Sequence, residues 1–240
     1  MILIISAPSH IGIIPDGNRR LAKRLMQMPW KGHEMGLGKI KNVASWCNEL
    51  GVKNVTIYLL SLENLQNRPR RELSYLFGLA RGELKEILEN AKHSVHLNKT
   101  RVRFFGRLEV LPADIQQGIR LVEEKTGRYT NAFLNLAIAY GGRQEITEAV
   151  RRLAKDAQKG RIKVGSIKES TLRNYMWAGE LSDPDMVIRT GGEKRLSNFL
   201  PFQSTYSELL FMDKFWPELS KDDIAAAIKE YGERQRRFGK

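Results

Sequence analysis

Apolar runs of strand length alternate with segments of helical periodicity along most of this chain. The apolar runs predict strands at residues 10–15, 54–60, 101–105, 132–140, 185–189 and 208–212. The helical patterns predict helices at residues 33–50, 70–97, 112–126, 143–158, 168–177 and 220–237. Such alternation is typical of a mostly parallel sheet covered by helices. We therefore predict an α/β fold, and ligands in such folds bind outside the carboxyl ends of the strands.

The chain length and the cysteine content narrow the class of protein. With 240 residues the chain is long enough for one sizeable domain and short for two, so we expect a single domain over residues 1–240. Cys47 is the only cysteine, which excludes an intramolecular disulfide and argues against a thiolate zinc site. Because it falls in a helical pattern, we expect it to be a small buried hydrophobe.

The charge balance favours anionic partners. The formal net charge is +13, which suits nucleic acid, phosphorylated metabolites or an acidic membrane surface, and charge alone does not choose among them. No apolar run approaches the roughly 20 residues of a membrane span. The apolar start lacks a basic region and a cleavage site, so it reads as a first strand rather than a signal peptide, and we expect a cytoplasmic protein.

The loop after the first predicted strand combines a glycine, an acid and two arginines. Residues 15–20 read PDGNRR. Gly17 lets the backbone approach a ligand closely, and exposed amides at such a turn can hold phosphate oxygens. Arg19 and Arg20 add charge-assisted donors, and Asp16 could hold a Mg²⁺ ion that bridges to the phosphates. The alternative is an ordinary Asp-Gly turn with solvated arginines.

A second loop of similar chemistry follows the fifth predicted strand. Residues 189–198 read RTGGEKRLSN, so the strand leads into a Gly-Gly loop that carries Arg189, Arg195 and Ser197. Two guanidinium groups and a hydroxyl suit a phosphate. The spacing fits neither the Walker loop nor the GxGxxG dinucleotide motif. Two separate anion sites at strand ends predict two phosphorylated substrates.

The histidines outside these loops give little indication of a catalytic or metal-binding role. His10 lies at the start of a strand, where we expect a structural role. His93 and His96 lie three residues apart in the helix predicted over residues 70–97. Because no carboxylates stand at suitable spacing, we expect these two side chains to be solvated rather than to bind a metal.

Five stretches of the chain, in order, resemble the motifs of the cis-prenyltransferases, the family typified by undecaprenyl diphosphate synthase. They are HIGIIPDGNRRLAK at 10–23, GHEMG at 32–36, SLENLQNRP at 61–69, LNLAIAYGGRQEI at 134–146, and the segment 185–219 together with the RRFG tail at 236–239. The stretches span nearly the whole chain, and the last is highly specific. The resemblance implies a single parallel-sheet α/β domain that usually pairs as a homodimer.

The resemblance also implies roles for individual residues. Asp16 would bind the Mg²⁺ of the allylic diphosphate, and Glu208 would touch the same magnesium site, from this subunit or from the other. The implied contacts to the allylic diphosphate are Gly17, Asn18, Arg19 and Arg20, with His33 at its rim, and Lys31 and Arg68 are further substrate-binding candidates. The implied contacts to isopentenyl diphosphate are Arg189, Arg195 and Ser197.

Two further pairs of residues are implied by the same resemblance. Ser61 and Asn64 would lie near the carbon that loses a proton. Arg237 and Gly239 match a tail that, in this family, reaches the active site of the neighbouring subunit.

Three departures from the family's motifs fall near the allylic site. Pro29 stands where the family usually has an arginine, so that a cationic contact is missing or is supplied by Arg24 or Lys31. The opening motif differs at two residues after Asp-Gly-Asn, and the segment 61–69 holds one residue more than the commonest version. The choice of allylic substrate, and even the regiochemistry of coupling, is therefore where this chain could deviate.

The implied reaction condenses isopentenyl diphosphate with a C15 or C20 allylic diphosphate and gives a longer cis-polyprenyl diphosphate for lipid-carrier biosynthesis. Magnesium and arginines would stabilise the leaving diphosphate, and no strong base is needed because the cationic intermediate is very acidic. The growing chain requires an apolar tunnel. The helix at 70–97 and the strand at 132–140 are apolar enough to line it, and Gly78 and Ala80 would leave room. A hydrophobic product and a basic protein surface favour loose association with membranes.

Two other readings of the sequence stay open. A basic nucleic-acid-binding protein would share the net charge, but the basic residues are spread along the chain and no RRM, KH or zinc-finger pattern occurs. A non-catalytic partner subunit typically lacks the aspartate loop, whereas Asp16, Arg189, Arg195 and Glu208 are all present here.

Overall fold

A computed structural model of the chain describes residues 7–28 and 30–234. Within these residues, six strands form one sheet in the order β3-β4-β2-β1-β5-β6, and all neighbouring pairs are parallel. The strands are β1 (His10–Ile14), β2 (Asn54–Ser61), β3 (Thr100–Phe105), β4 (Ala132–Tyr140), β5 (Met186–Arg189) and β6 (Glu208–Phe211). The predicted α/β fold with a parallel sheet is thus confirmed. Because β1 lies between β2 and β5, the strand order reverses there, which is where such sheets bind ligands.

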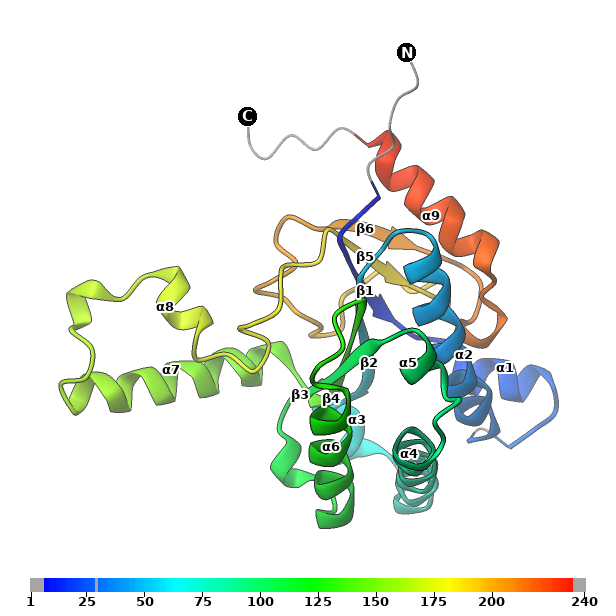
Figure 1. The fold of residues 1–240 in the computed structure, drawn as a ribbon, viewed down its shortest axis with the longest axis horizontal. Coiled ribbons are helices and arrows are strands. Elements are labelled where there is room, and N and C mark those ends of the chain that lie inside the picture. Colours follow the sequence, from blue (N-terminus) through cyan, green and yellow to red (C-terminus); the bar gives the residue numbers. More distant parts are fainter. Residues whose placement is uncertain (1–6, 29, 235–240) are drawn as a thin grey trace.

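The helices of the described residues gather mainly on one side of this sheet (Figure 1). They are α1 (Asn18–Arg24), α2 (Lys31–Glu49), α3 (Leu62–Asn67), α4 (Arg70–Glu89), α5 (Ser94–Leu97), α6 (Ala113–Thr126), α7 (Gly142–Gln158), α8 (Glu169–Arg173) and α9 (Lys221–Glu233). Short 3₁₀ turns add η1 (Leu108–Val110), η2 (Val164–Ser166) and η3 (Trp216–Glu218). None of these helices is long and apolar enough to cross a membrane.

Two apolar clusters hold the sheet, one on each face, because successive strand residues point to opposite sides. On β5, Met186 and Ile188 belong to the larger cluster under the helices, whereas Val187 belongs to the smaller one. The smaller cluster is closed by Phe199 and Leu200, which come from a loop. Helices therefore cover one face, and turns and loops cover much of the other.

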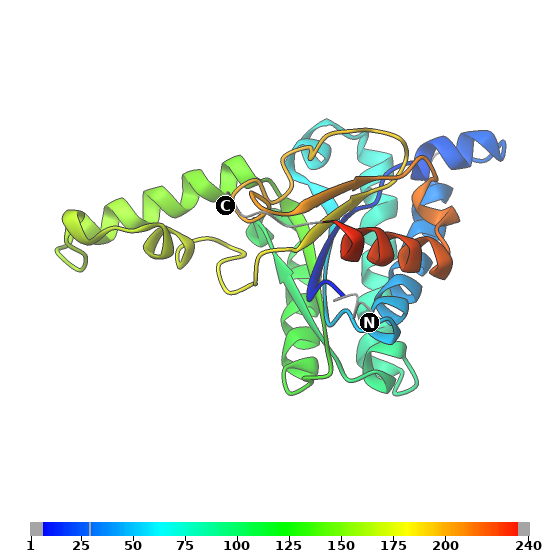
Figure 2. The ribbon, with the colours of Figure 1, turned by 90° about the horizontal axis from the view of Figure 1, so that it is seen from above.

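Helices α7 and α8 form an arm that extends away from the body of the molecule (Figures 1 and 2). The buried carboxylate of Glu145, at the base of this arm, accepts hydrogen bonds from Tyr140 Oη and from the backbone N–H of Ala178, both at 2.7 Å. Further out, Val150 and Val164 are exposed. The base of the arm is thus fixed to the sheet, while its length presents apolar side chains to its surroundings.

The single long helix predicted over residues 70–97 is wrong, because α4 ends at Glu89 and α5 begins only at Ser94. Asn90 leaves the helical conformation, and its side chain accepts a hydrogen bond from the N–H of Lys92 at 2.9 Å. Asparagine competes with helix in this way by bonding to nearby backbone. The helix predicted over 168–177 is likewise shorter, and two short helices, α1 and α3, were not predicted.

The expectation that His93 and His96 are solvated is also wrong. Both side chains are buried, at 5% and 8% exposure. His93 caps α5, since its Nδ1 accepts a hydrogen bond from the N–H of Val95, and its Nε2 lies 3.1 Å from Glu83 Oε1. Glu83 precedes His93 by ten residues, so helical spacing did not reveal it. No three His, Cys, Asp or Glu side chains gather as a metal site anywhere in residues 7–28 and 30–234.

His10 and Cys47 have the structural positions predicted for them. The ring of His10 is 1% exposed, with Nδ1 at 2.7 Å from the carbonyl of Ser182 and Nε2 at 2.7 Å from Thr56 Oγ1. It joins β1 to β2 and to the segment before β5. Cys47 is fully buried in the helical core cluster, and burial raises the pKa of its thiol to about 12.

We predict that the free energy of unfolding falls as the pH is lowered from 7 to 5. Burial lowers the pKa of His10 below 6.5, and burial followed by the charge of Arg68 lowers the pKa of His33 in the same direction. Below pH 6.5 the histidines of the unfolded chain bind protons while those of the folded chain do not. The histidine contribution to the free energy of unfolding is therefore fully present above about pH 6.5 and is lost as the pH falls toward the folded-state pKa values. Denaturant unfolding at several pH values measures the effect. His10→Gln should reduce the slope, and an unchanged slope in this variant would contradict the role of His10.

Candidate active site

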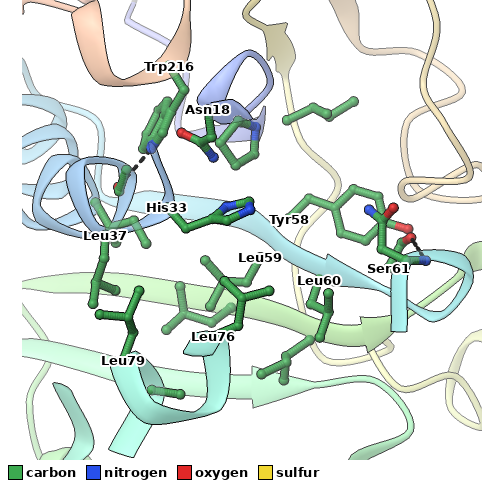
Figure 3. Close-up of a pocket in the computed structure, with 18 of the residues that line it drawn as sticks. Asn18, His33, Leu37, Tyr58, Leu59, Leu60, Ser61, Leu76, Leu79 and Trp216 are labelled. Carbon is green, nitrogen blue, oxygen red and sulfur yellow. Dashed lines mark hydrogen bonds between the residues drawn. The ribbon is translucent and has the colours of Figure 1, made fainter. Parts of the chain in front are cut away.

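A cavity of about 1020 Å³ opens at the carboxyl ends of β1, β2 and β5 and continues between α2, α4 and the sheet. Its polar end includes Asn18, His33 and Ser61, and leucines line the part below (Figure 3). The apolar lining comes from α2, α4, β2 and β4, and includes Leu37, Ile40, Leu60, Leu76, Leu79, Ala80, Leu84, Ile87, Leu134, Leu136 and Ile138. The cavity therefore suits a molecule with an anionic head and a hydrocarbon tail.

Asp16 stands at the centre of the polar end. Its Oδ2 accepts a hydrogen bond from Arg189 Nη2 at 2.8 Å, and its Oδ1 accepts one from the N–H of Gly17 at 2.6 Å. Arg20 Nη2 lies 3.2 Å from Oδ1. Although burial raises the pKa of this carboxyl, the bonds from Arg189 and Gly17 outweigh it and the pKa is lowered. Asp16 is thus a carboxylate at neutral pH.

Two glycines allow close packing around the loop after β1. Gly17 has φ +97°, and a Cβ there would lie 2.4 Å from a ring carbon of Phe215, in the segment after β6. Gly191 in the loop after β5 has φ +85°, and a Cβ there would lie 2.6 Å from Arg20 Nη2. In this left-handed region a side chain is strained as well as crowded. Glycine at these two positions therefore lets the segments after β5 and β6 pack against the loop after β1.

Arg189 is the buried cation of the site, with 5% of its side chain exposed. Besides Asp16, its Nη1 donates to the carbonyl of Arg195 and to Ser197 Oγ, both at 2.6 Å. Its Nε has no partner within the described residues. Arg195 itself is exposed at the cavity rim and ion-pairs with Glu193. The guanidinium of Arg189 is thus held by three acceptors, beside a second, exposed arginine.

A second charged group lies on the other side of the mouth. His33 Nε2 is 3.0 Å from Glu72 Oε1, and Arg68 Nη1 is 3.3 Å from the same oxygen. Arg68 Nε is buried without a partner in the described part of the chain. Burial, and then the nearby charge of Arg68, lower the pKa of His33. A neutral imidazole on α2 and an arginine at the end of α3 therefore line the cavity on this side.

Ser61 and Asn64 line the cavity where β2 ends and α3 begins. Ser61 Oγ accepts a hydrogen bond from the N–H of Asn64 at 3.0 Å, which caps α3 and leaves the hydroxyl proton available. Across the cavity, Asn198 Nδ2 donates to Glu63 Oε1 at 2.8 Å. Arg143 also lines this part of the cavity, and its N–H donates to Asn198 Oδ1.

Most residues that the sequence proposed for the site do line this one cavity. They are Asp16, Gly17, Asn18, Arg19, Arg20, His33, Ser61, Asn64, Arg68, Arg189, Arg195 and Ser197. Sequence reasoning did not single out Glu63, Glu72, Arg143 and Glu193. Arg68 ends α3 and Glu72 lies in the first turn of α4, so helical spacing gave no signal for that carboxylate.

The remaining proposed residues are placed elsewhere or fall outside the described residues. Lys31 ion-pairs with Glu34 at 2.7 Å and does not line the cavity. Glu208 begins β6, at the opposite end of β5 from Arg189, and pairs with Arg234 at 2.8 Å. Within one chain, Glu208 therefore does not contact Asp16. Arg237, Gly239 and Pro29 lie outside the described residues.

The arginine that the family usually has at position 29 is not replaced by its neighbours in the described structure. Arg24 pairs with Glu218 and stacks on Phe215, so it faces away from the cavity lining, as Lys31 does. Arg68 is the additional cation that does line the cavity.

The chemistry of the mouth also fits a divalent cation. Mg²⁺ prefers one or two carboxylates and completes its shell with water and phosphate oxygens. Asp16 offers a carboxylate at the mouth, and Asn18 Oδ1 is a buried oxygen without a partner among the described residues. The ion would need a phosphate ligand here, since Asp16 already accepts from Arg189 and Gly17.

Comparisons with known proteins agree with this geometry. A family model described as putative undecaprenyl diphosphate synthase matches residues 14–239. A protein of Methanopyrus kandleri named tritrans,polycis-undecaprenyl-diphosphate synthase (geranylgeranyl-diphosphate specific) is 49% identical over 233 residues, covering 97% of this chain and 85% of that protein. A protein of Pyrococcus furiosus with the same name is 42% identical, with 97% and 87% covered.

Solved structures agree as well. Lavandulyl diphosphate synthase from Lavandula x intermedia, in complex with dimethylallyl diphosphate, superposes with a TM-score of 0.91 at 31% identity over 98% of this chain and 99% of that one. A probable undecaprenyl diphosphate synthase from Campylobacter jejuni superposes with a TM-score of 0.78 at 31% identity, over 98% and 100%. The match to the family model over nearly the whole chain, and the relatives above 40% identity, show that this chain belongs to the undecaprenyl diphosphate synthase family of cis-prenyltransferases.

Proposed function

We propose that this chain uses geranylgeranyl diphosphate as its primer and extends it with isopentenyl diphosphate into a long cis-polyprenyl diphosphate. Condensation of isopentenyl diphosphate with an allylic diphosphate is the activity of its family. The relatives at 42–49% identity carry names that specify geranylgeranyl diphosphate. The observation that carries the proposal is one cavity with cationic loops at its mouth and a deep apolar interior.

The two loops at the mouth suit two diphosphates of different roles. The allylic diphosphate would lie against Gly17, Asn18, Arg19 and Arg20, with Arg68 and His33 at its rim. The diphosphate of isopentenyl diphosphate would lie against Arg189, Arg195 and Ser197, which line the same side of the cavity. Since Asp16 bonds to Arg189 at 2.8 Å, the two sites share one charged junction, and the reacting carbons are brought together.

The chain's residues would divide the chemistry in the following way. The C–O bond of the allylic diphosphate breaks, and its electron pair leaves on the diphosphate, where arginines stabilise the developing charge. The double bond of isopentenyl diphosphate supplies the electrons of the new C–C bond. A proton is then lost and a new double bond forms, near Ser61 and Asn64. Bound Mg²⁺, held by Asp16, would supply further neutralisation of the leaving diphosphate.

The apolar interior would hold the growing hydrocarbon away from water. Residues of α4 and β4 line it, and of the pair Gly78 and Ala80 it is Ala80 that lines the cavity. Gly78 is exposed on the outside of the helix and does not line it. A cavity of about 1020 Å³ favours chain elongation over a single condensation between short substrates.

We further propose that the enzyme is a homodimer in the cytoplasm that associates loosely with membranes. The arm of α7 and α8 extends from the body and exposes Val150 and Val164, and the edge strand β6 exposes Leu209. In a dimer, Glu208 and the C-terminal tail could complete a neighbour's site. The net charge of +13 supports attraction to acidic lipids.

Product analysis with different primers tests the proposed function. The purified protein is incubated with Mg²⁺, labelled isopentenyl diphosphate and geranyl, farnesyl or geranylgeranyl diphosphate in turn, and the extracted products are sized. Long products should form most efficiently from geranylgeranyl diphosphate. Asp16→Ala should lower the rate by roughly 100-fold or more, because the carboxylate and the anchor of Arg189 are both lost. Asp114→Ala, which removes an exposed carboxylate paired with Arg81, is the control. No product from any primer by the folded protein would contradict the proposal.

Product length tests the placement of the hydrocarbon. Ala80→Trp should shorten the final product, because an indole would occupy the apolar part of the cavity. Gly78→Trp, two residues away on the exposed face of the same helix, should leave the length unchanged. The measurement is the product distribution on reversed-phase thin layers. Equal lengths from both variants would show that the hydrocarbon does not follow α4.

A further inference from the structure

The far half of the cavity carries a charged cluster that the proposed reaction does not use. Glu83 on α4 accepts a hydrogen bond from His93 Nε2 at 3.1 Å, and its other oxygen lies 2.9 Å from Lys41 Nζ on α2. All three side chains line the cavity. We call Lys41, Glu83 and His93 the polar clasp. It connects α2, α4 and the segment before α5.

The position of the polar clasp places it beyond the reach of the diphosphates. Lys41 follows His33 by eight residues on α2, which is about 12 Å along the helix at 1.5 Å per residue. Glu83 follows Leu76 by seven residues on α4, which is about 10 Å. A substrate whose diphosphate lies at the mouth brings only hydrocarbon to this depth. The polar clasp therefore faces the growing chain rather than the reacting atoms.

The polar clasp forms part of the cavity wall between α2 and α4. Lys41 comes from α2 and Glu83 from α4, and both side chains line the cavity. Their ion pair joins the two helices across this part of the wall, with the side chains 34% and 19% exposed. We expect the two helices to be less firmly joined here when one of these side chains is removed.

The hydrogen bonds of the polar clasp are directional. The N–H of Val95 donates to His93 Nδ1, so the proton of the neutral ring is on Nε2 and points to Glu83. Burial raises the pKa of Glu83, but the bonds from His93 and Lys41 outweigh it and lower the pKa. Apolar side chains would seal an apolar cavity at least as well, because a partly exposed ion pair stabilises little. Charged groups instead allow the contact between α2 and α4 to break and re-form.

We propose that the polar clasp closes a side opening between α2 and α4 and thereby sets the longest product that the cavity accepts. The inference rests on the proposed function. With the polar clasp closed, the hydrocarbon fills a cavity of limited size and elongation stops. With it broken, the end of the chain passes out between the two helices, and condensations at the mouth continue.

Product sizing in the presence of detergent micelles tests this inference, because micelles can accept the emerging hydrocarbon. Lys41→Ala removes the most exposed member and leaves the bond between His93 and Glu83 in place. Its products should extend beyond the wild-type maximum by one or more isoprene units, with the rate of the first condensation within twofold of wild type. Lys85→Ala, which removes an exposed lysine paired with Glu89 on the same helix, should give the wild-type distribution.

A reversible link tests the closure in one folded protein. Lys41→Cys and Glu83→Cys are combined and joined by a reducible bis-thiosulfonate linker, while the buried thiol of Cys47, with a pKa of about 12, stays unreacted. The linked protein should stop at the wild-type length, and reduction should lengthen the products. Unchanged or shorter products from Lys41→Ala and from the reduced pair would overturn the inference. Since the wild type would still elongate its primer, that outcome leaves the proposed function intact.

Discussion

The ion pair between Arg189 and Asp16 is the interaction on which the site depends. Parallel pairing puts Arg189 of β5 beside Ile14 of β1, and Asp16 follows two residues later. A guanidinium that is 5% exposed is costly unless a carboxylate and further acceptors surround it, and Asp16, Ser197 and a backbone carbonyl supply them. The loops after two strands are thereby fixed to each other, with both cationic sites on one side of the junction.

The sheet order explains why a single junction can serve two substrates. The strand order reverses at β1, and a ligand crevice is expected at the carboxyl ends of β1 and β5, where the Asp16–Arg189 pair joins the two loops. Below the crevice, α2 and α4 stand apart from the sheet and leave an apolar cavity rather than a filled core. With its polar mouth and apolar interior, the cavity can orient an amphipathic substrate by its two ends alone.

The sequence predicted most of the fold and most of the mouth, for a physical reason. Buried parallel strands are uninterrupted apolar runs, and the chemistry of such sheets lies in the residues that follow them, so the loops at Asp16 and Arg189 could be found by position. Features that depend on tertiary contacts could not be predicted from the sequence. The helix break at Asn90 could not be predicted, because it falls within a stretch of helical apolar periodicity. Glu83 contacts His93 only because the chain turns between them.

A structure with both substrates bound tests the central claim most directly. The protein would be crystallised with Mg²⁺, isopentenyl diphosphate and an unreactive thio analogue of geranylgeranyl diphosphate. The account predicts one diphosphate against the loop at Asp16, the other against Arg189 and Ser197, and the hydrocarbon between α2 and α4. Diphosphates bound away from the carboxyl ends of β1 and β5, or a hydrocarbon that leaves the mouth without entering the cavity, would contradict it.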